Sequence, residues 1–120
     1  MEMKLYEDAE NILRIAFSKA EKNAPSIILI DDIDLIERKK DKIKNEFEIK
    51  ILSLLIYLMD SLFSNSKIIV FGTTTKIKDI EPDLKTNERF SKEIEIGIPN
   101  ENDRLEILKI HTKKMKLNEI

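Results

Sequence analysis

The sequence lacks cysteine and tryptophan, and its 120 residues include only two glycines, three prolines and one histidine. Without cysteine there can be no disulfide bond, thiolate catalysis or cysteine-ligated zinc, and a lone histidine argues against a histidine-based metal site. The 21 Lys and Arg residues nearly balance the 23 Asp and Glu residues, and the formal net charge is −2. Because nucleic-acid binding requires a basic surplus, we expect no nucleic acid partner.

Long hydrophobic runs are also missing. The longest apolar run falls far short of the ~20 residues that a membrane-spanning helix needs. The N-terminus shows no basic, apolar and small-residue signal for secretion. The sequence therefore predicts neither membrane insertion nor export, and its length is that of one domain or a well-defined piece of a larger one.

The hydrophobic pattern predicts alternating helices and strands. Apolar residues at helical spacing predict helices over about 7–23, 46–62 and 101–111, with Asn45 and Asn100 as caps. Short β-favouring runs predict strands at 26–30, 67–71 and 93–96, and the first two are apolar enough to be buried on both faces. The charged stretch 35–45 is expected to be a short helix that passes into a solvated, mobile loop. This alternation predicts an α/β fold with a parallel sheet.

Two of the predicted strands end in polar clusters, Asp31-Asp32 and Thr73-Thr74-Thr75. Ligands of open parallel sheets bind at the carboxyl ends of the strands. Four apolar residues followed by two acids form the pattern of a Walker B strand, in which the first acid holds the water shell of a nucleotide-bound Mg²⁺ and the second polarises the attacking water. By itself the pattern also fits a buried strand that simply re-enters solvent. A phospho-accepting receiver domain fits poorly, because no Asp follows the second strand directly.

Four segments together carry a resemblance to a known family. They are AEKNAPSIILIDDID at 20–34, LLIYLMDSL at 54–62, RFSKEIEIGIP at 89–99 and RLEILKIHTKKMKL at 104–117. In this order they resemble the first ATPase domain of the valosin-containing protein (transitional endoplasmic reticulum ATPase, or cell division cycle ATPase) family of AAA ATPases. The resemblance implies a partial P-loop NTPase-type fold, a three-layer α/β/α parallel sheet, over residues 1–117. It also implies that a small helical subdomain begins within 101–117.

The resemblance assigns roles around a nucleotide. Asp31 corresponds to the Mg²⁺-associated acid, and Asp32 stands where the family has a catalytic Glu. Thr75 stands where the family has the sensor Asn that helps to hold the attacking water. Arg89 matches the second of two arginine fingers that reach into a neighbouring subunit, and Thr86 occupies the position of the first.

Further positions match adenosine and substrate contacts of the family. Ile107 and His111 match the pair that packs on the adenosine, although a histidine at a helix end also interacts with terminal carbonyls. The segment Lys4, Leu5 and Tyr6 matches the first pore loop, which faces the substrate channel of a hexamer. The charged residues 37–44 match the second pore loop in position only.

The departures from the family pattern bear on hydrolysis. The carboxylate of Asp32 sits one methylene further back than that of Glu, and a base must come within ~2.6–3.2 Å of its water or act through another water. Thr75 has no amide reach, and Thr86 removes a cation that would stabilise charge on the transferring phosphate. Together these three residues point to slow or lost hydrolysis at this site.

The chain also contains no GxxxxGK[ST] motif, whose backbone amides and Lys would cradle the phosphates. In the family the P-loop lies some tens of residues before the first pore loop, so we expect that Met1 is not the natural start of a folded domain. The 120 residues alone should bind ATP weakly or not at all, and their open sheet edges should favour dimers or aggregates.

The resemblance implies a hexameric ATPase in the cytoplasm, nucleus or an organelle that uses ATP and Mg²⁺ to unfold or extract protein substrates with the help of adaptors. The alternatives are a degenerate domain that serves as an interface without turnover, and a regulatory piece that associates with full-length subunits.

Overall fold

The computed structural model describes residues 2–35, 46–62 and 66–116. Helices α1 (Glu2–Lys22), α2 (Glu46–Ser61) and α3 (Glu101–Thr112) alternate with strands β1 (Ser26–Ile30) and β2 (Ile68–Gly72). Three single-turn 3₁₀ helices, η1 (Ile33–Leu35), η2 (Ile77–Asp79) and η3 (Pro82–Lys85), complete the described elements. The predicted α/β class is therefore confirmed. The charged stretch 37–44 and the predicted cap Asn45 lie outside the described residues.

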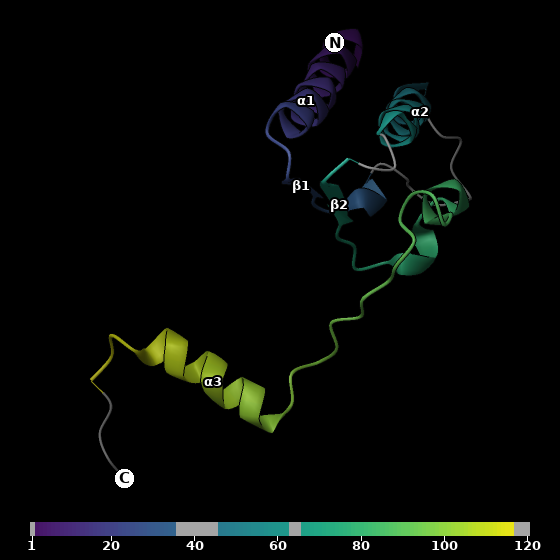
Figure 1. Ribbon diagram of the computed structural model, residues 1–120. Coiled ribbons are helices and arrows are strands. Elements are labelled where there is room, and N and C mark those ends of the chain that lie inside the picture. Colours follow the sequence, from purple (N-terminus) through teal and green to yellow (C-terminus); the bar gives the residue numbers. More distant parts are fainter. Residues whose placement is uncertain (1, 36–45, 63–65, 117–120) are drawn as a thin grey trace.

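Strands β1 and β2 pair in parallel, as predicted. The register runs from Ser26 opposite Ile68 to Ile30 opposite Gly72. Helix α2 forms part of the crossover between the two strands, which is the connection that parallel pairing requires. Because the strands run in register, the residues that follow Ile30 and Gly72 emerge at the same end of the sheet (Figure 1).

One face of this sheet packs against the helices. Ile28 is buried, and Ile30, Ile68 and Val70 pack against the core cluster. The core is supplied mainly by α1, α2 and the turns after each strand, namely by Phe17, Ala20, Ile33, Leu54, Leu55, Leu58, Met59, Ile80 and Leu84. Each fully buried large apolar side chain stabilises the fold by about 1.5–3 kcal/mol.

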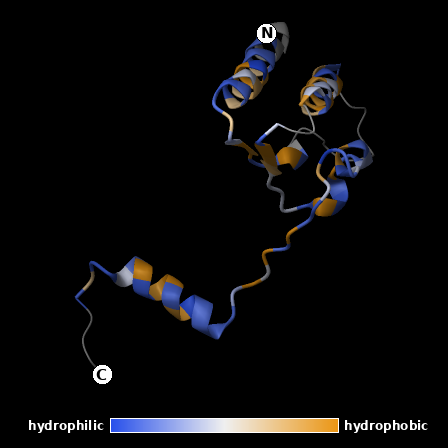
Figure 2. Ribbon diagram, in the orientation of Figure 1, coloured by the Kyte–Doolittle hydropathy of each residue, from blue (hydrophilic) through white to orange (hydrophobic). Residues whose placement is uncertain are grey.

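The opposite face of the sheet corrects the prediction of strands buried on both faces. Ile27 and Leu29 are 65% and 66% exposed, and Ile69 and Phe71 of β2 are exposed beside them. Figure 2 shows both strands in the colours of hydrophobic residues. A strand covered on a single face typically alternates apolar and polar residues, so the continuous apolar runs of β1 and β2 leave an apolar face of the sheet uncovered within the described residues.

Helix α1 is longer at its N-terminus than predicted, since it begins at Glu2 instead of about Glu7. An ion pair one turn apart joins Arg14 Nε to Glu10 Oε1 at 2.8 Å on its exposed side. The helix ends near the predicted position, where Asn23 donates from its backbone and its side chain to the carbonyl of Lys19.

The predicted third strand at 93–96 is wrong. Residues 91–100 contain no regular element and all are exposed, and Ile96 has 94% of its surface in contact with solvent. An alternating pattern becomes a strand only when a partner strand takes up its backbone hydrogen bonds. Within the described residues, the sheet comprises only β1 and β2.

The final helix, α3, begins where predicted. The side chain of Asn100 accepts a bond from the backbone N–H of Asp103, and the Asp103 carboxylate accepts one from Asn100 N–H in return. This reciprocal capping box fixes the start of the helix. Figure 1 shows α3 apart from the sheet and from α1 and α2, at the end of the extended segment 91–100.

Candidate functional site

The polar residues after β1 and β2 form one connected cluster. Thr73 N–H donates to the carbonyl of Ile30 at 3.0 Å, and Ile33 N–H donates to the carbonyl of Thr73 at 2.9 Å. These two bonds continue the parallel pairing beyond the last paired residues. They hold the segment Asp31-Asp32 beside the start of the Thr73–Thr75 segment, as the sequence predicted.

Thr73 makes the closest link between the two strand ends. Its hydroxyl donates to the Asp31 carboxylate, and its oxygen accepts the backbone N–H of Asp32 at 3.0 Å. The hydrogen bond to Thr73 occupies Oδ1 of Asp31, so it fixes the orientation of the carboxylate while Oδ2 is not used by this bond. One threonine thereby positions both acids of the Walker B pattern.

Thr74 makes a second link next to the first. Its hydroxyl donates to Asp34 Oδ1 at 2.7 Å and accepts the backbone N–H of Lys76 at 2.9 Å. Asp34 lies in η1, so this bond ties the short helix to the end of β2. Thr75 is exposed at the same end of the sheet, but the hydrogen bonds described here are made by Thr73 and Thr74.

The backbone at Asp32 adopts an unusual conformation, with a φ of 52°. This left-handed region is uncommon for residues other than glycine, and Asp is one of the few side chains enriched there. Non-glycine residues in such conformations cluster at functional sites, where surrounding contacts hold them. Here the contact is the bond from Asp32 N–H to Thr73.

Gly72, the last residue of β2, allows close packing beneath this cluster. A Cβ atom at this position would lie 2.9 Å from Cδ1 of Ile33 and 3.1 Å from Cζ of Phe90. The absence of a side chain therefore lets the segment after β1 and the segment around Phe90 meet over the end of β2. This contact joins the two strand ends to the region that contains Arg89.

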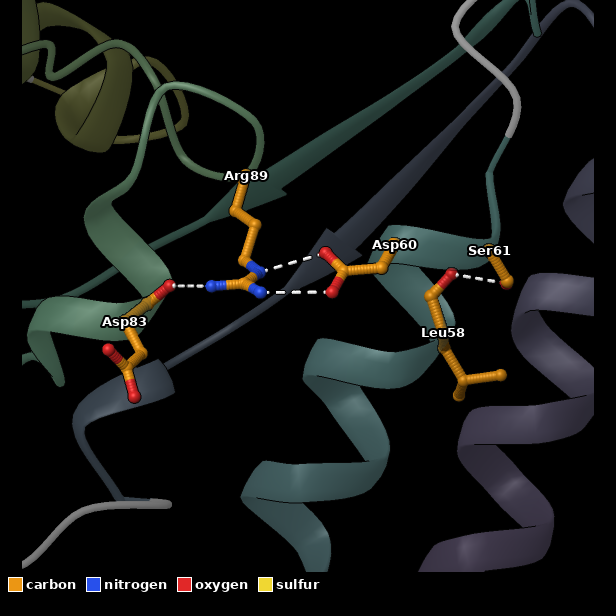
Figure 3. Close-up of polar contacts among 5 residues, drawn as sticks. All are labelled: Leu58, Asp60, Ser61, Asp83 and Arg89. Atoms are coloured by element: carbon orange, nitrogen blue, oxygen red, sulfur yellow. Dashed lines mark hydrogen bonds and ion pairs between the residues drawn. The ribbon is translucent and has the colours of Figure 1, made fainter.

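Arg89 lies in a separate polar cluster at the end of α2 (Figure 3). Its Nε and Nη2 donate to the two carboxylate oxygens of Asp60, each at 2.9 Å, and its Nη1 donates to the backbone carbonyl of Asp83. The hydrogen bond from Arg89 lowers the pKa of Asp60 and, in return, Asp60 raises the pKa of Arg89. The predicted arginine finger is thus bound within its own chain.

The other predicted site residues are not brought to the strand ends. Ile107 and His111 lie on α3, which stands apart from the sheet in Figure 1. Lys4, Leu5 and Tyr6 lie within helix α1, near its N-terminus, rather than in a loop. Thr86 is exposed at the C-terminal end of η3.

Sequence reasoning missed four residues that the structure makes important: Asp34, Asp60, Thr73 and Thr74. In the sequence, Thr73 and Thr74 are only members of a polar run, and the family resemblance points to Thr75 instead. The available signal for Asp60 was an acid inside the apolar segment LLIYLMDSL. Its partner Arg89 is 29 residues away in the sequence, and residue spacing predicts contacts only within a helix or between neighbouring strands, so the pair could not be found in this way.

The chemistry of the strand ends suits a hydrated Mg²⁺ bound to phosphates. Carboxylate and hydroxyl oxygens are hard ligands, and Mg²⁺ in nucleotide sites keeps several waters and uses only one or two carboxylates together with the phosphates. Asp31, whose carboxylate is oriented by Thr73, could serve as such a ligand. Among residues 2–35, 46–62 and 66–116, no group of three or more acidic or histidine side chains is arranged to hold a metal ion.

No helix within the described ranges combines the length and apolar character that crossing a membrane would require.

A comparison with protein families agrees with this geometry. The model of the ATPase family associated with various cellular activities (AAA) matches residues 1–98, a span that includes both strands, the polar cluster at their ends and Arg89. Helix α3 lies beyond the matched span. AAA proteins are ATPases that bind ATP with Mg²⁺, and the partial α/β fold with its parallel strands is consistent with a P-loop NTPase-type sheet. The chain therefore belongs to the AAA family of ATPases.

Proposed function

We propose that this chain is part of an ATPase domain of the valosin-containing protein type, in a hexamer that uses ATP hydrolysis to unfold or extract protein substrates. The observation that carries the proposal is the cluster at the ends of β1 and β2. There, Thr73 holds both Asp31 and Asp32 by hydrogen bonds. Adaptors that deliver substrates, and a cytoplasmic, nuclear or organellar location, belong to the same proposal.

Asp31 and Asp32 have different tasks in this proposal. Asp31 would hold the water shell of Mg²⁺, because Thr73 already fixes one of its oxygens and the carboxylate is exposed. Asp32 would polarise the attacking water, and Thr75 would help to hold that water. When bound, Mg²⁺ supplies Lewis-acid stabilisation of charge on the phosphates. Because the chain contains no GxxxxGK[ST] motif, the cradle for the phosphates would come from residues outside it.

The remaining assignments rest on the family resemblance. Arg89 would act on the nucleotide of a neighbouring subunit. Ile107 and His111 would pack on the adenosine, which requires α3 to lie closer to the ends of β1 and β2 than it does in Figure 1. Lys4, Leu5 and Tyr6 would face the substrate channel from the N-terminal end of α1.

A second candidate is a hydrolysis-deficient domain that serves as an interface within the hexamer. Two observations at Asp32 favour it. The side chain is one methylene shorter than the Glu of the family, and the residue has a φ of 52°, a conformation that Asp tolerates better than Glu does. The shortened carboxylate would therefore lie further from an attacking water, and a misplacement of about 1 Å can lower a rate about 100-fold.

The ATPase rate of the natural full-length protein separates the two candidates. Wild-type protein should be compared with the Asp32→Glu, Asp32→Asn and Asp31→Ala variants, and ATP binding should be measured for each. An active ATPase predicts turnover in the wild type that Asp32→Asn abolishes. A hydrolysis-deficient domain predicts ATP binding without turnover, and a gain in rate with Asp32→Glu. If neither the wild type nor Asp32→Glu binds or hydrolyses ATP, both candidates are wrong.

A further inference from the structure

Asp60 and Arg89 form the most completely bonded ion pair among the described residues. The guanidinium and the carboxylate form a bidentate pair through two parallel hydrogen bonds of 2.9 Å. This is the geometry in which an Arg–carboxylate pair is strongest and most directional. A third bond to the Asp83 carbonyl fixes the guanidinium from η3. Figure 3 shows Arg89 between these two acceptors.

The position of Asp60 is unfavourable for a carboxylate considered alone. Asp60 lies in the last turn of α2, where the helix carries partial negative charge on its final carbonyl groups, and a negative side chain there is destabilising. The hydroxyl of Ser61 and the backbone N–H of Leu62 donate to carbonyls of this turn, whereas Asp60 brings a further acceptor. The bound Arg89 compensates for this charge.

The bonds to Asp60 and Asp83 do not use all the donors of Arg89. A guanidinium has five N–H groups, and three are taken by Asp60 and by the Asp83 carbonyl. One N–H on Nη1 and one on Nη2 are left by these three bonds. The Arg89 side chain is 18% exposed, so part of it can be reached by a group outside the chain.

Arg89 also belongs to a segment that contacts the strand ends. The next residue, Phe90, approaches Gly72 at the end of β2, and its N–H donates to the carbonyl of Leu84 at 3.0 Å. Leu84 is 2% exposed. The backbone that carries Arg89 is therefore anchored in the core through Leu84 of η3 and through Phe90, and Asp60 supplies the contact that fixes its side chain.

We propose that Asp60 is a positioning residue for Arg89: it binds one edge of the guanidinium and so orients the two remaining N–H donors toward an anionic group outside the chain. This inference rests on the proposed function, in which the anion is the triphosphate bound to a neighbouring copy. Electrostatic catalysis depends on donors that are fixed before the charge develops, and a functional side chain is held in place by the bonds of its supporting residues.

The contact between Asp60 and Arg89 could instead inhibit Arg89, and this role predicts a different effect on kcat. If Asp60 merely neutralised Arg89 and kept it from the neighbouring subunit, removal of the carboxylate would free the cation and raise the rate. Positioning predicts a loss, because an unbound Arg89 samples many rotamers. The sign of the change therefore distinguishes the two roles.

The test is steady-state ATP hydrolysis by the natural full-length protein in its assembled form. Asp60→Ala should lower kcat by about 10- to 100-fold, the loss that a displacement of about 1 Å produces, while KM for MgATP stays within about twofold. Arg89→Ala should lower kcat at least as much, and the Asp60→Ala/Arg89→Ala double variant should be no slower than Arg89→Ala alone. A matched control is Glu88→Ala, which removes an equal charge that acts on Arg89 through space and should leave kcat within about twofold.

Two further measurements separate positioning from a loss of folding. Asp60→Glu retains both acceptor oxygens and should recover part of kcat, and the NMR signal of the Arg89 Nε–H should be retained in Glu88→Ala and lost in Asp60→Ala. An unchanged or raised kcat in Asp60→Ala would overturn the proposal. So would a double variant whose loss of kcat equals the product of the two single fold-losses, because Asp60 would then act independently of Arg89. Absence of ATP turnover in the wild type would instead refute the ATPase function on which the proposal rests.

Discussion

Replacement of Gly72 by alanine tests whether the strand ends depend on the close contact under them. The new Cβ would lie 2.9 Å and 3.2 Å from Cδ1 and Cγ2 of Ile33 and 3.1 Å from Cζ of Phe90. Ile33 is 5% exposed and has little room to move. Overpacking costs about 1–3 kcal/mol, and the lower entropy of the unfolded chain offsets about 0.4–1 kcal/mol. We therefore expect Gly72→Ala to lower the free energy of unfolding by about 1–2 kcal/mol.

Thermal unfolding followed by circular dichroism measures this loss, which should appear as a fall in Tm of roughly 3–12 °C for a domain of this size. Gly97→Ala is the matched control, because a Cβ at Gly97 meets nothing within 4 Å; its Tm should be unchanged or slightly higher. Ile33→Val, which removes Cδ1, should partly relieve the clash, so that the cost of the Gly72→Ala/Ile33→Val pair is at least about 0.5 kcal/mol below the sum of the single costs. The packing argument would be refuted if Gly72→Ala were as stable as the wild type. It would also be refuted if the loss of stability in the Gly72→Ala/Ile33→Val pair equalled the sum of the two single losses.

Three other predictions follow from contacts in the structure. Thr73→Val should speed hydrogen exchange at the Asp32 N–H, because its acceptor is lost, whereas Thr75→Val should not; equal rates in both variants would contradict the role of Thr73. Because Arg89 lowers the pKa of Asp60, this ion pair stabilises the fold at pH values above the unfolded-state pKa of about 3.9, and the stabilisation is lost as the pH falls through the lower folded-state pKa. In Arg89→Ala the pKa of Asp60, followed by ¹³C NMR of its carboxyl group, should rise. An unchanged titration curve would exclude the ion pair in solution. Leu55→Ala should lower the free energy of unfolding by about 2–5 kcal/mol, since Leu55 is 0% exposed. Tyr57→Ala, on the exposed side of α2, should change it by less than about 0.5 kcal/mol. Similar losses for the two variants in urea titrations would show that Leu55 does not lie in the core.

Local signals predicted the parts of the fold that depend on neighbouring residues. Asn100 after Pro99 predicted the start of the last helix, and the structure has it there, with Asp103 completing the capping box. The strand runs before Asp31 and before Thr73 predicted β1 and β2 to within one residue. These elements need no distant partner to be recognised.

Long-range contacts decided the features that the sequence did not predict. The segment 93–96 alternates like a strand, but no described strand pairs with it. Likewise, the sequence pointed to Thr75, whereas the bonds across the strand ends come from Thr73 and Thr74. Which hydroxyl of a threonine run meets which acid depends on the register of the two strands, and register becomes known only when the strands are placed together.

The Mg²⁺ dependence of ATP binding by the natural full-length protein shows whether the ends of β1 and β2 hold the metal of a bound nucleotide. ATP affinity should be measured with and without Mg²⁺ in wild-type protein, in Asp31→Asn and in Asp34→Asn, whose carboxylate is engaged by Thr74. We predict that Mg²⁺ strengthens ATP binding in the wild type and in Asp34→Asn and has no such effect in Asp31→Asn. If Asp31→Asn keeps the full Mg²⁺ dependence, Asp31 does not hold the metal and the proposed site is wrong.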